Sequence, residues 1–253
     1  MTARTAAAIV SFAAGLGLAG CSSFYEIAVE TPIQAKIDVS AFQRVLVAGF
    51  LTGGAKAIDA NTETARLLRS QLRSKQDMRV IDTDVLSLVD EVDRQKGQAP
   101  ASTAPDAEPR IKTDKDLEAY EQIFNDAAYW KKLGAEYQNP LIVTGSVMFT
   151  EVSKSGIVSR PQSVPNEQGL EEYRSVRTYT DMKGYALSPK FIFIDGRTGA
   201  QLYSETYHEE ALYPSTQNTP ALSSYFELMD KVLPSFLNTL SSQKIRGSRV
   251  LLK

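Results

Sequence analysis

Apolar residues occur along this chain in two patterns, continuous runs and spaced stripes. Continuous runs lie at residues 44–51 and 191–194 and in the first half of 141–149, whose second half alternates, and such runs fit strands that are buried on both faces of a sheet. Spaced stripes repeat every three or four residues, as the buried face of an amphipathic helix does. Because the two patterns alternate along the chain, they predict an α/β fold in which helices pack on a sheet.

The first two stripes predict two helices in the amino-terminal half of the chain. The first helix is expected to end near Ser74, and the second carries Val85, Leu88, Val89 and Val92 on one face. Side chains that accept hydrogen bonds from backbone amides mark where helices start. The candidate caps are Asp59, Asn61 or Thr62 for the first helix and Asp82 or Thr83 for the second.

Two further stripes predict longer helices. One helix is expected at 114–137. Another is expected to run from Pro220 toward Leu240, with Thr219 as its cap and Pro220 at the first helical position. Pro234 should kink this last helix, because proline removes one backbone donor and crowds the preceding turn.

Shorter strands complete the expected sheet. A strand at 78–81 lies between the first two helices, and this order implies a crossover connection and a parallel pair of strands. The sequence Asp-Gly-Arg-Thr-Gly at 195–199 fits a tight hairpin that needs a positive φ, followed by a more exposed strand at 200–207. Weaker strand patterns lie at 25–29 and 249–253.

These elements predict one α/β domain at residues 41–253. The expected architecture is a mixed sheet of about five strands with helices packed on it, in two or three layers. Two segments rich in proline and polar residues, at 97–113 and 153–174, are expected to be irregular inserts.

The amino terminus has the pattern of an export signal. Arg4 is its one charge, the residues from Ala6 to Leu18 are almost wholly apolar, and small residues follow. The apolar run is shorter than the roughly 20 residues that a membrane-spanning helix needs. We therefore interpret residues 1–20 as a signal peptide and residues 21–40 as a tether with a first strand.

The signal ends in Leu18-Ala19-Gly20-Cys21, which resembles the lipobox of bacterial lipoproteins. The resemblance implies cleavage before Cys21 and acylation of its thiol and new amino group, so the protein would be attached to a membrane by lipid. Cys21 is also the one cysteine of the chain, so it has no partner for an internal disulfide. By resemblance to the sorting of enterobacterial lipoproteins, Ser22 after the cysteine, in place of aspartate, implies the periplasmic face of the outer membrane rather than the inner membrane.

Composition gives little support to catalysis or to nucleic-acid binding. The formal charge of the 253 residues is -2, without the basic face of a nucleic-acid binder. His208 is the one histidine, and a protein zinc site needs three or four Cys or His ligands. The adjacent carboxylates Glu171-Glu172 and Glu209-Glu210 point to opposite faces of a strand. Gly53-Gly54 lacks the flanking residues of a phosphate-binding loop. We expect no catalytic, cofactor or metal site.

The order of motifs resembles the amino-terminal domain of TolB. The motifs are Arg44-Val-Leu-Val-Ala-Gly-Phe, Ile142-Val-Thr-Gly-Ser-Val and Phe193-Ile-Asp-Gly-Arg-Thr-Gly-Ala. Lipoproteins of curli secretion and lipoprotein activators of penicillin-binding proteins share that fold. The resemblance implies an envelope lipoprotein with the same α/β fold, and it carries over no partner-binding residue.

The expected function is non-enzymatic docking, assembly or regulation of another periplasmic or outer-membrane protein. Tyrosine is enriched in binding surfaces, so five tyrosines are candidate contacts, although each could instead pack on the sheet. They are Tyr173, Tyr179, Tyr203, Tyr207 and Tyr213. Two alternatives stay open, a subunit of a secretion or export channel and a hydrolase with an unrecognised active site, which loss of activity in His208→Ala would support. Formation of a homo-oligomer is also open.

Overall fold

The computed structural model describes residues 24–74, 78–98, 110–165, 170–241 and 243–252. The signal peptide and Cys21 lie outside these residues, as does most of the insert at 97–113. The described residues form two compact units, one within residues 36–241 and a second made of residues 24–35 and 243–252. Among the described helices, none combines the length and the apolar character needed to cross a membrane.

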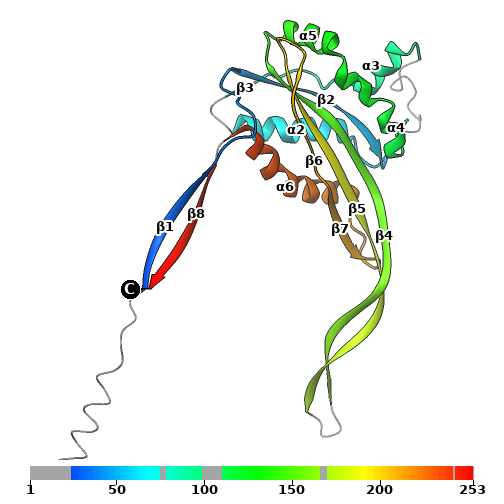
Figure 1. Ribbon diagram of the computed structural model, residues 1–253. Helices are drawn as coiled ribbons and strands as arrows, with labels where there is room; N and C mark the ends of the chain where they lie inside the picture. The colour runs from blue at the N-terminus through cyan, green and yellow to red at the C-terminus, as the bar shows by residue number, and fades with distance from the viewer. Residues whose placement is uncertain (1–23, 75–77, 99–109, 166–169, 242, 253) are drawn as a thin grey trace, which may run out of the picture. The chain divides into compact units, whose positions relative to one another are not determined.

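The unit of residues 36–241 is built on a mixed six-stranded sheet (Figure 1). The strand order is β3-β2-β4-β5-β6, and β7 also pairs with β5. The pairs β2–β3 and β2–β4 are parallel, whereas β5 is antiparallel to β4, β6 and β7. The expected mixed sheet is confirmed, with one strand more than expected. The strands are β2 (Arg44–Gly54), β3 (Arg79–Val80), β4 (Leu141–Pro165), β5 (Glu171–Asp195), β6 (Gln201–Thr206) and β7 (Glu209–Pro214).

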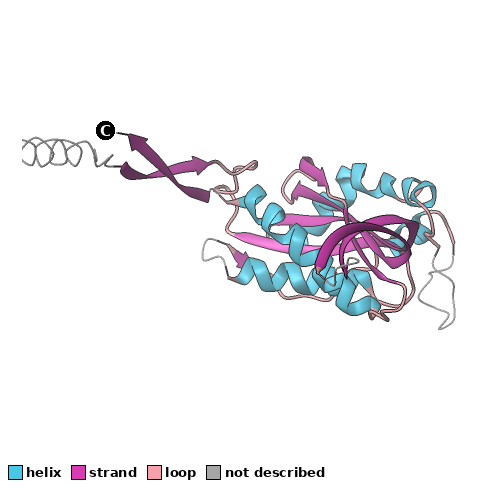
Figure 2. Cartoon of the chain, turned by 90° about the horizontal axis from the view of Figure 1, so that it is seen from below, coloured by secondary structure: helices cyan, strands magenta, loops and turns pink. Residues whose placement is uncertain are grey.

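Helices cover both faces of this sheet, so the unit has three layers (Figure 2). Alternate residues of β2 enter two separate cores: Val45 and Val47 one, Leu46 and Ala48 the other. The continuous apolar run of this strand therefore reflects burial on both faces. Helices α2 (Ala60–Arg73) and α6 (Ala221–Leu240) pack on one face, and α3 (Leu88–Gln95), α4 (Asp114–Glu118), the 3-10 helix η3 (Glu121–Asn125) and α5 (Ala127–Glu136) pack on the other.

The helix starts differ in part from the sequence expectation. Asp59 caps α2, accepting a hydrogen bond from the amide of Thr62, so one of its three candidate caps is confirmed. Helix α3 starts later than expected and is capped by Ser87, because the Leu86 amide donates to the Ala48 carbonyl and keeps the preceding chain along β2. Thr219 does not cap α6, whose first residue follows Pro220.

The single helix expected at 114–137 is divided into three short ones. The Asp126 carboxylate accepts hydrogen bonds from the amides of Ala128 and Tyr129 and starts a new helix there. The Trp130 indole donates to the Ile123 carbonyl at 2.8 Å, which fixes the break from inside the core. The predicted stripe is buried at Leu117, Tyr120 and Phe124, but its continuation at Ala127, Ala128 and Lys131 is exposed, because these local hydrogen bonds start a new helix there.

The segment at 153–174 is not irregular, which corrects the sequence expectation. Strands β4 and β5 stay in register from Leu141–Asp195 out to Pro165–Glu171. Beyond Lys154 and Met182, no other described strand pairs with them. We call residues 155–181 the arm. Pro161 and Pro165 fit a strand here because proline is tolerated at a sheet edge, where no ladder bond is lost.

The second unit is a two-stranded ribbon. Strand β1 (Phe24–Ile33) pairs antiparallel with β8 (Gln243–Leu252), from Phe24 opposite Leu252 to Ile33 opposite Gln243. Both strand patterns noted at the two ends of the sequence are present in it, and both strands are longer than expected.

Candidate functional site

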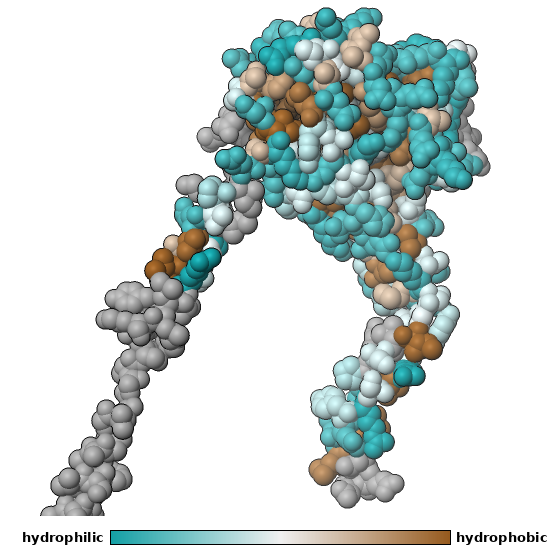
Figure 3. All heavy atoms as spheres, viewed as in Figure 1, coloured by the Kyte–Doolittle hydropathy of each residue, from teal (hydrophilic) through white to brown (hydrophobic). Residues whose placement is uncertain are grey.

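The arm carries the largest group of exposed apolar side chains. The exposed fractions are 71% for Ile157, 65% for Leu170, 75% for Tyr173 and 65% for Tyr179. These are four of the seven large apolar side chains that are exposed in the described part of the chain. Hydrophobic atoms recur along the arm among hydrophilic ones (Figure 3). The extended strand pair therefore presents apolar anchors on both of its strands.

Strand register places these anchors together. Ile157 lies opposite Tyr179, so the two residues share one face of the ribbon. Tyr173 is on the same face of β5, because side chains alternate along a strand. Charged residues of both signs lie between the anchors. On β5 these are Glu171, Glu172, Arg174, Arg177 and Asp181.

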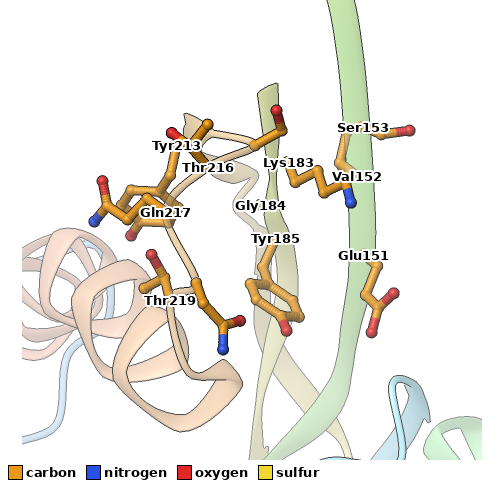
Figure 4. A pocket seen from close by; sticks show the side chains of 12 residues that line it. Glu151, Val152, Ser153, Lys183, Gly184, Tyr185, Tyr213, Thr216, Gln217 and Thr219 are labelled. Atoms are coloured by element: carbon orange, nitrogen blue, oxygen red, sulfur yellow. The ribbon is translucent and has the colours of Figure 1, made fainter. Parts of the chain in front are cut away.

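A hollow of about 730 Å³ lies at the root of the arm (Figure 4). Strand β4 contributes Glu151, strand β5 contributes Lys183 and Tyr185, and the loop after β7 contributes Gln217. The Tyr185 ring is stacked on Phe149 at 4.8 Å and is thereby fixed against the core. One carboxylate, one ammonium group, a phenol and an amide suit recognition of polar backbone and side-chain groups.

Tyr213 lies in this hollow but is not a free surface group. It is half-buried against the core, and its hydroxyl donates to Glu227. Burial, followed by this hydrogen bond, raises the pKa of Tyr213, and the bond lowers the pKa of Glu227. The interaction ties the end of β7 to α6, so it positions the wall of the hollow.

Tyr203 and Tyr207 also pack on the sheet. Both are half-buried against the core that α2 and α6 cover. The Tyr207 hydroxyl donates to the Glu205 carboxylate at 2.7 Å, and burial is the main reason why the pKa of Tyr207 is raised. The five candidate tyrosines thus divide into two groups: Tyr173 and Tyr179 are exposed on the arm, and the other three support the fold.

The structure also brings Ser188, His208 and Glu210 together, which sequence reasoning missed. The Ser188 hydroxyl lies 2.8 Å from His208 Nδ1, and His208 Nε2 lies 3.4 Å from Glu210 Oε1. Glu210 is also paired with Lys154, and that hydrogen bond is the main cause of its lowered pKa. Ser188 and His208 are 20 residues apart in the sequence, so only the pairing of the strands shows that their side chains meet.

This cluster does not have the arrangement of a catalytic triad. In a triad, a buried carboxylate orients the histidine and stabilises its charge. Here the imidazole is 59% exposed, and its carboxylate partner is shared with an ammonium group. In the described part of the chain, no group of three or more His, Cys, Asp or Glu side chains could hold a metal ion.

No protein-family model matches the sequence, and no curated protein matches it. Several solved structures are similar to this chain. Lipoprotein GNA1162 from Neisseria meningitidis is 16% identical, over 77% of this chain and 98% of that one, with a TM-score of 0.31. A PelC dodecamer from Paraburkholderia phytofirmans is 13% identical, over 86% and 99%, with a TM-score of 0.36. The LpoB C-terminal domain from Escherichia coli is 10% identical, over 66% and 83%, with a TM-score of 0.25.

The fold defines an α/β domain with a mixed sheet, and its structural neighbours include a bacterial lipoprotein. Because each of these TM-scores is below 0.5, the description of the fold rests on strand order and layers, and no partner or activity is carried over from these neighbours.

Proposed function

We propose that this chain is a non-enzymatic envelope lipoprotein that docks onto another envelope protein through its arm. Lipid on Cys21 attaches it to the periplasmic face of the outer membrane, and the α/β unit supports the arm. Several acyl chains hold a protein durably at a membrane, whereas a single chain holds it marginally.

The arm is the observation that carries this proposal. A two-stranded hairpin alone in water is marginally stable, and exposed strand edges tend to pair with other chains. The described arm has no third strand beside it, and its apolar anchors face solvent. Association would cover the anchors and pair the edges.

The composition of the arm favours a protein partner. Protein interfaces are enriched in tyrosine and arginine and have polar rims. The arm combines Tyr173 and Tyr179 with Arg174 and Arg177 on the same strand. Charged residues of both signs interrupt its faces, which suits another folded surface better than the interior of a lipid layer.

Photocrosslinking in living cells tests the docking. A photoreactive amino acid at Tyr179 or Tyr173 should form an adduct with a distinct envelope protein that mass spectrometry can identify. Leu222 is the matched control, because it is exposed on α6 and far along the chain from the arm. Recovery of uncrosslinked chain alone from the two arm positions would refute docking through the arm. Adducts with the same chain would instead point to a homo-oligomer.

The anchor has a separate test. Cys21→Ser should move the protein from the membrane pellet to the soluble fraction, and labelled palmitate should enter the wild-type protein only. If the variant still pellets with the membranes, or if the wild type takes up no label, the lipid attachment is wrong.

A further inference from the structure

The outer side of β5 is an open strand edge along the arm. Strand β7 pairs with this side of β5 from Leu187 to Met182 and ends at Pro214 (Figure 1). The Ser215 amide then donates to the Asp181 carbonyl at 2.8 Å. Beyond Asp181, no described strand pairs with β5 on the side away from β4. A further strand could therefore lie beside the arm in line with β7.

The register shows which backbone groups of β5 face this open edge. In an antiparallel pair, the N–H and C=O of one residue point to the same side, and those of the next residue point to the other side. Because the Asp181 carbonyl faces the β7 side, so do the backbone groups of Tyr179, Arg177, Ser175 and Tyr173. The pairing of β5 with β4 has no register shift in the arm, so this alternation is unbroken. Each of these residues presents one donor and one acceptor to the edge.

The opposite edge of the arm, formed by β4, is interrupted. The Phe149 carbonyl accepts a hydrogen bond from the Ala55 amide, so it faces away from β5. By the same alternation, Pro161 and Pro165 also face away from β5. Proline has no amide hydrogen to donate, and prolines on an edge strand hinder pairing with other chains. A ring of identical copies would pair the β5 edge of one chain with the β4 edge of the next, so these prolines favour a different protein on the β5 edge.

The side chains along the open edge suit a particular strand. Tyr173, Arg177 and Tyr179 lie exposed on one face of β5, with the guanidinium between the two rings. In the described part of the chain, Arg177 has no ion-pair partner. Residues directly opposite each other on neighbouring strands share a face, where aromatic rings favour apolar side chains and cations favour carboxylates.

We propose that the envelope partner adds an extended strand to the β5 edge of the arm, in line with β7. This inference deepens the proposed docking and rests on it. The added strand carries apolar side chains opposite Tyr173 and Tyr179 and an aspartate or glutamate opposite Arg177. In this mode of recognition, main-chain hydrogen bonds supply affinity and alternate side chains supply specificity.

A proline on each edge of the arm tests strand addition. Ser175→Pro removes an amide hydrogen that faces outward from β5, and Ser163→Pro removes one that faces outward from β4. The two strands of the arm keep their mutual hydrogen bonds in both variants, so Ser163→Pro is the matched control. Each chain carries a photoreactive amino acid at Tyr179 in intact cells. We expect Ser175→Pro to lower the yield of the adduct with the envelope protein about tenfold, and Ser163→Pro to change it less than about twofold.

The outcomes separate strand addition from docking in general. If the chain without either proline forms no adduct, the proposed docking fails and this inference fails with it. An adduct that both prolines leave unchanged supports docking through the side chains of the arm and overturns strand addition. Equal losses from the two prolines overturn the choice of the β5 edge. Adducts with a second copy of the chain overturn the choice of a different protein.

Arg177 gives a second test that leaves the backbone unchanged. Arg177→Glu should lower the adduct yield about fivefold, because it places two carboxylates opposite each other, and Arg177→Lys should retain the yield. Arg174→Glu is the matched control, because its side chain lies on the other face of β5. Equal effects of the two glutamate variants would mean that the added strand does not carry a carboxylate opposite Arg177.

Discussion

At the scale of single residues, buried polar groups in this protein are matched to specific partners. The Tyr225 side chain is fully buried between α2 and α6, and its hydroxyl lies 2.5 Å from Thr64 Oγ1. Its ring contacts Phe149 edge-on at 5.3 Å between centroids. Burial raises the pKa of this tyrosine, so the hydroxyl keeps its proton. One side chain thus joins both helices to the sheet.

Tyr225→Phe should lower the free energy of unfolding by about 1 kcal/mol, because it removes one buried hydrogen bond and leaves the ring in place. Tyr225→Ala should cost about 3–5 kcal/mol, because it also leaves a cavity. Urea denaturation measures both values. Equal losses for the two variants would contradict the role assigned to the ring.

Glu205 should make the stability sensitive to acid. Burial acts to raise its pKa, but hydrogen bonds from Lys36 and Tyr207 outweigh burial, so the pKa lies below its ordinary value of 4.5. A carboxyl group whose pKa is lower in the folded than in the unfolded chain stabilises the fold at pH values above its unfolded-state pKa. This stabilisation is lost as the pH falls through its folded-state pKa. Glu205→Gln should therefore reduce stability near neutral pH and flatten the loss below about pH 4.5. Urea denaturation midpoints of both proteins are measured across this pH range. If the midpoints of the two proteins fall in parallel as the pH is lowered, the role assigned to Glu205 is wrong.

At the scale of elements, the sequence predicts those helices and strands whose own residues carry a clear apolar pattern. The run 44–51 is continuously apolar and the stripe of α6 has a helical period, and both elements are present. Strand β7 was missed because Glu209–Pro214 has little alternation and is held by its pairing with β5.

The arm was missed because Pro161 and Pro165 argue against an internal strand, while only tertiary pairing shows that they lie at an edge. Its exposed tyrosines could be nominated from the sequence, but not separated from buried ones.

Shortening the arm should leave the α/β unit folded. Gly156 and Thr180 are opposite each other, so replacing residues 157–179 with Asn-Gly gives a short hairpin turn at that pair. The free energy of unfolding should change by less than about 1 kcal/mol, because the removed residues lie outside both cores. Crosslinking to the envelope partner should be lost. A short-arm variant that still crosslinks from elsewhere on the unit would show that docking does not need the arm.

At the scale of the whole molecule, two units have different sources of stability. Residues 36–241 contain the two hydrophobic cores and all six strands of the large sheet. The other unit has ladder hydrogen bonds between β1 and β8, a ribbon that by itself is marginal in water. The large unit should therefore fold without the ribbon, and the ribbon should depend on its surroundings.

Deleting residues 242–253 tests this division. The melting temperature of the remaining chain should match that of the full chain within about 2 °C, because both cores are retained. Hydrogen exchange should become fast in β1, which has lost its pairing strand, and stay slow in β2 and β4. A large drop in melting temperature would mean that the two units stabilise each other.

The pairing of β1 with β8 also sets an order of events during synthesis. The Thr239 carbonyl accepts hydrogen bonds from the amides of Lys36 and Ile37, so folding of the intervening chain brings the two ends of the large unit side by side. Until then, closing so long a loop carries an entropic cost that two short strands would have to offset. An incomplete copy therefore leaves β1 without its pairing strand, and an unpaired strand exposes backbone groups that can pair with other chains. The ribbon therefore closes only after β8, its carboxyl-terminal strand, has been made.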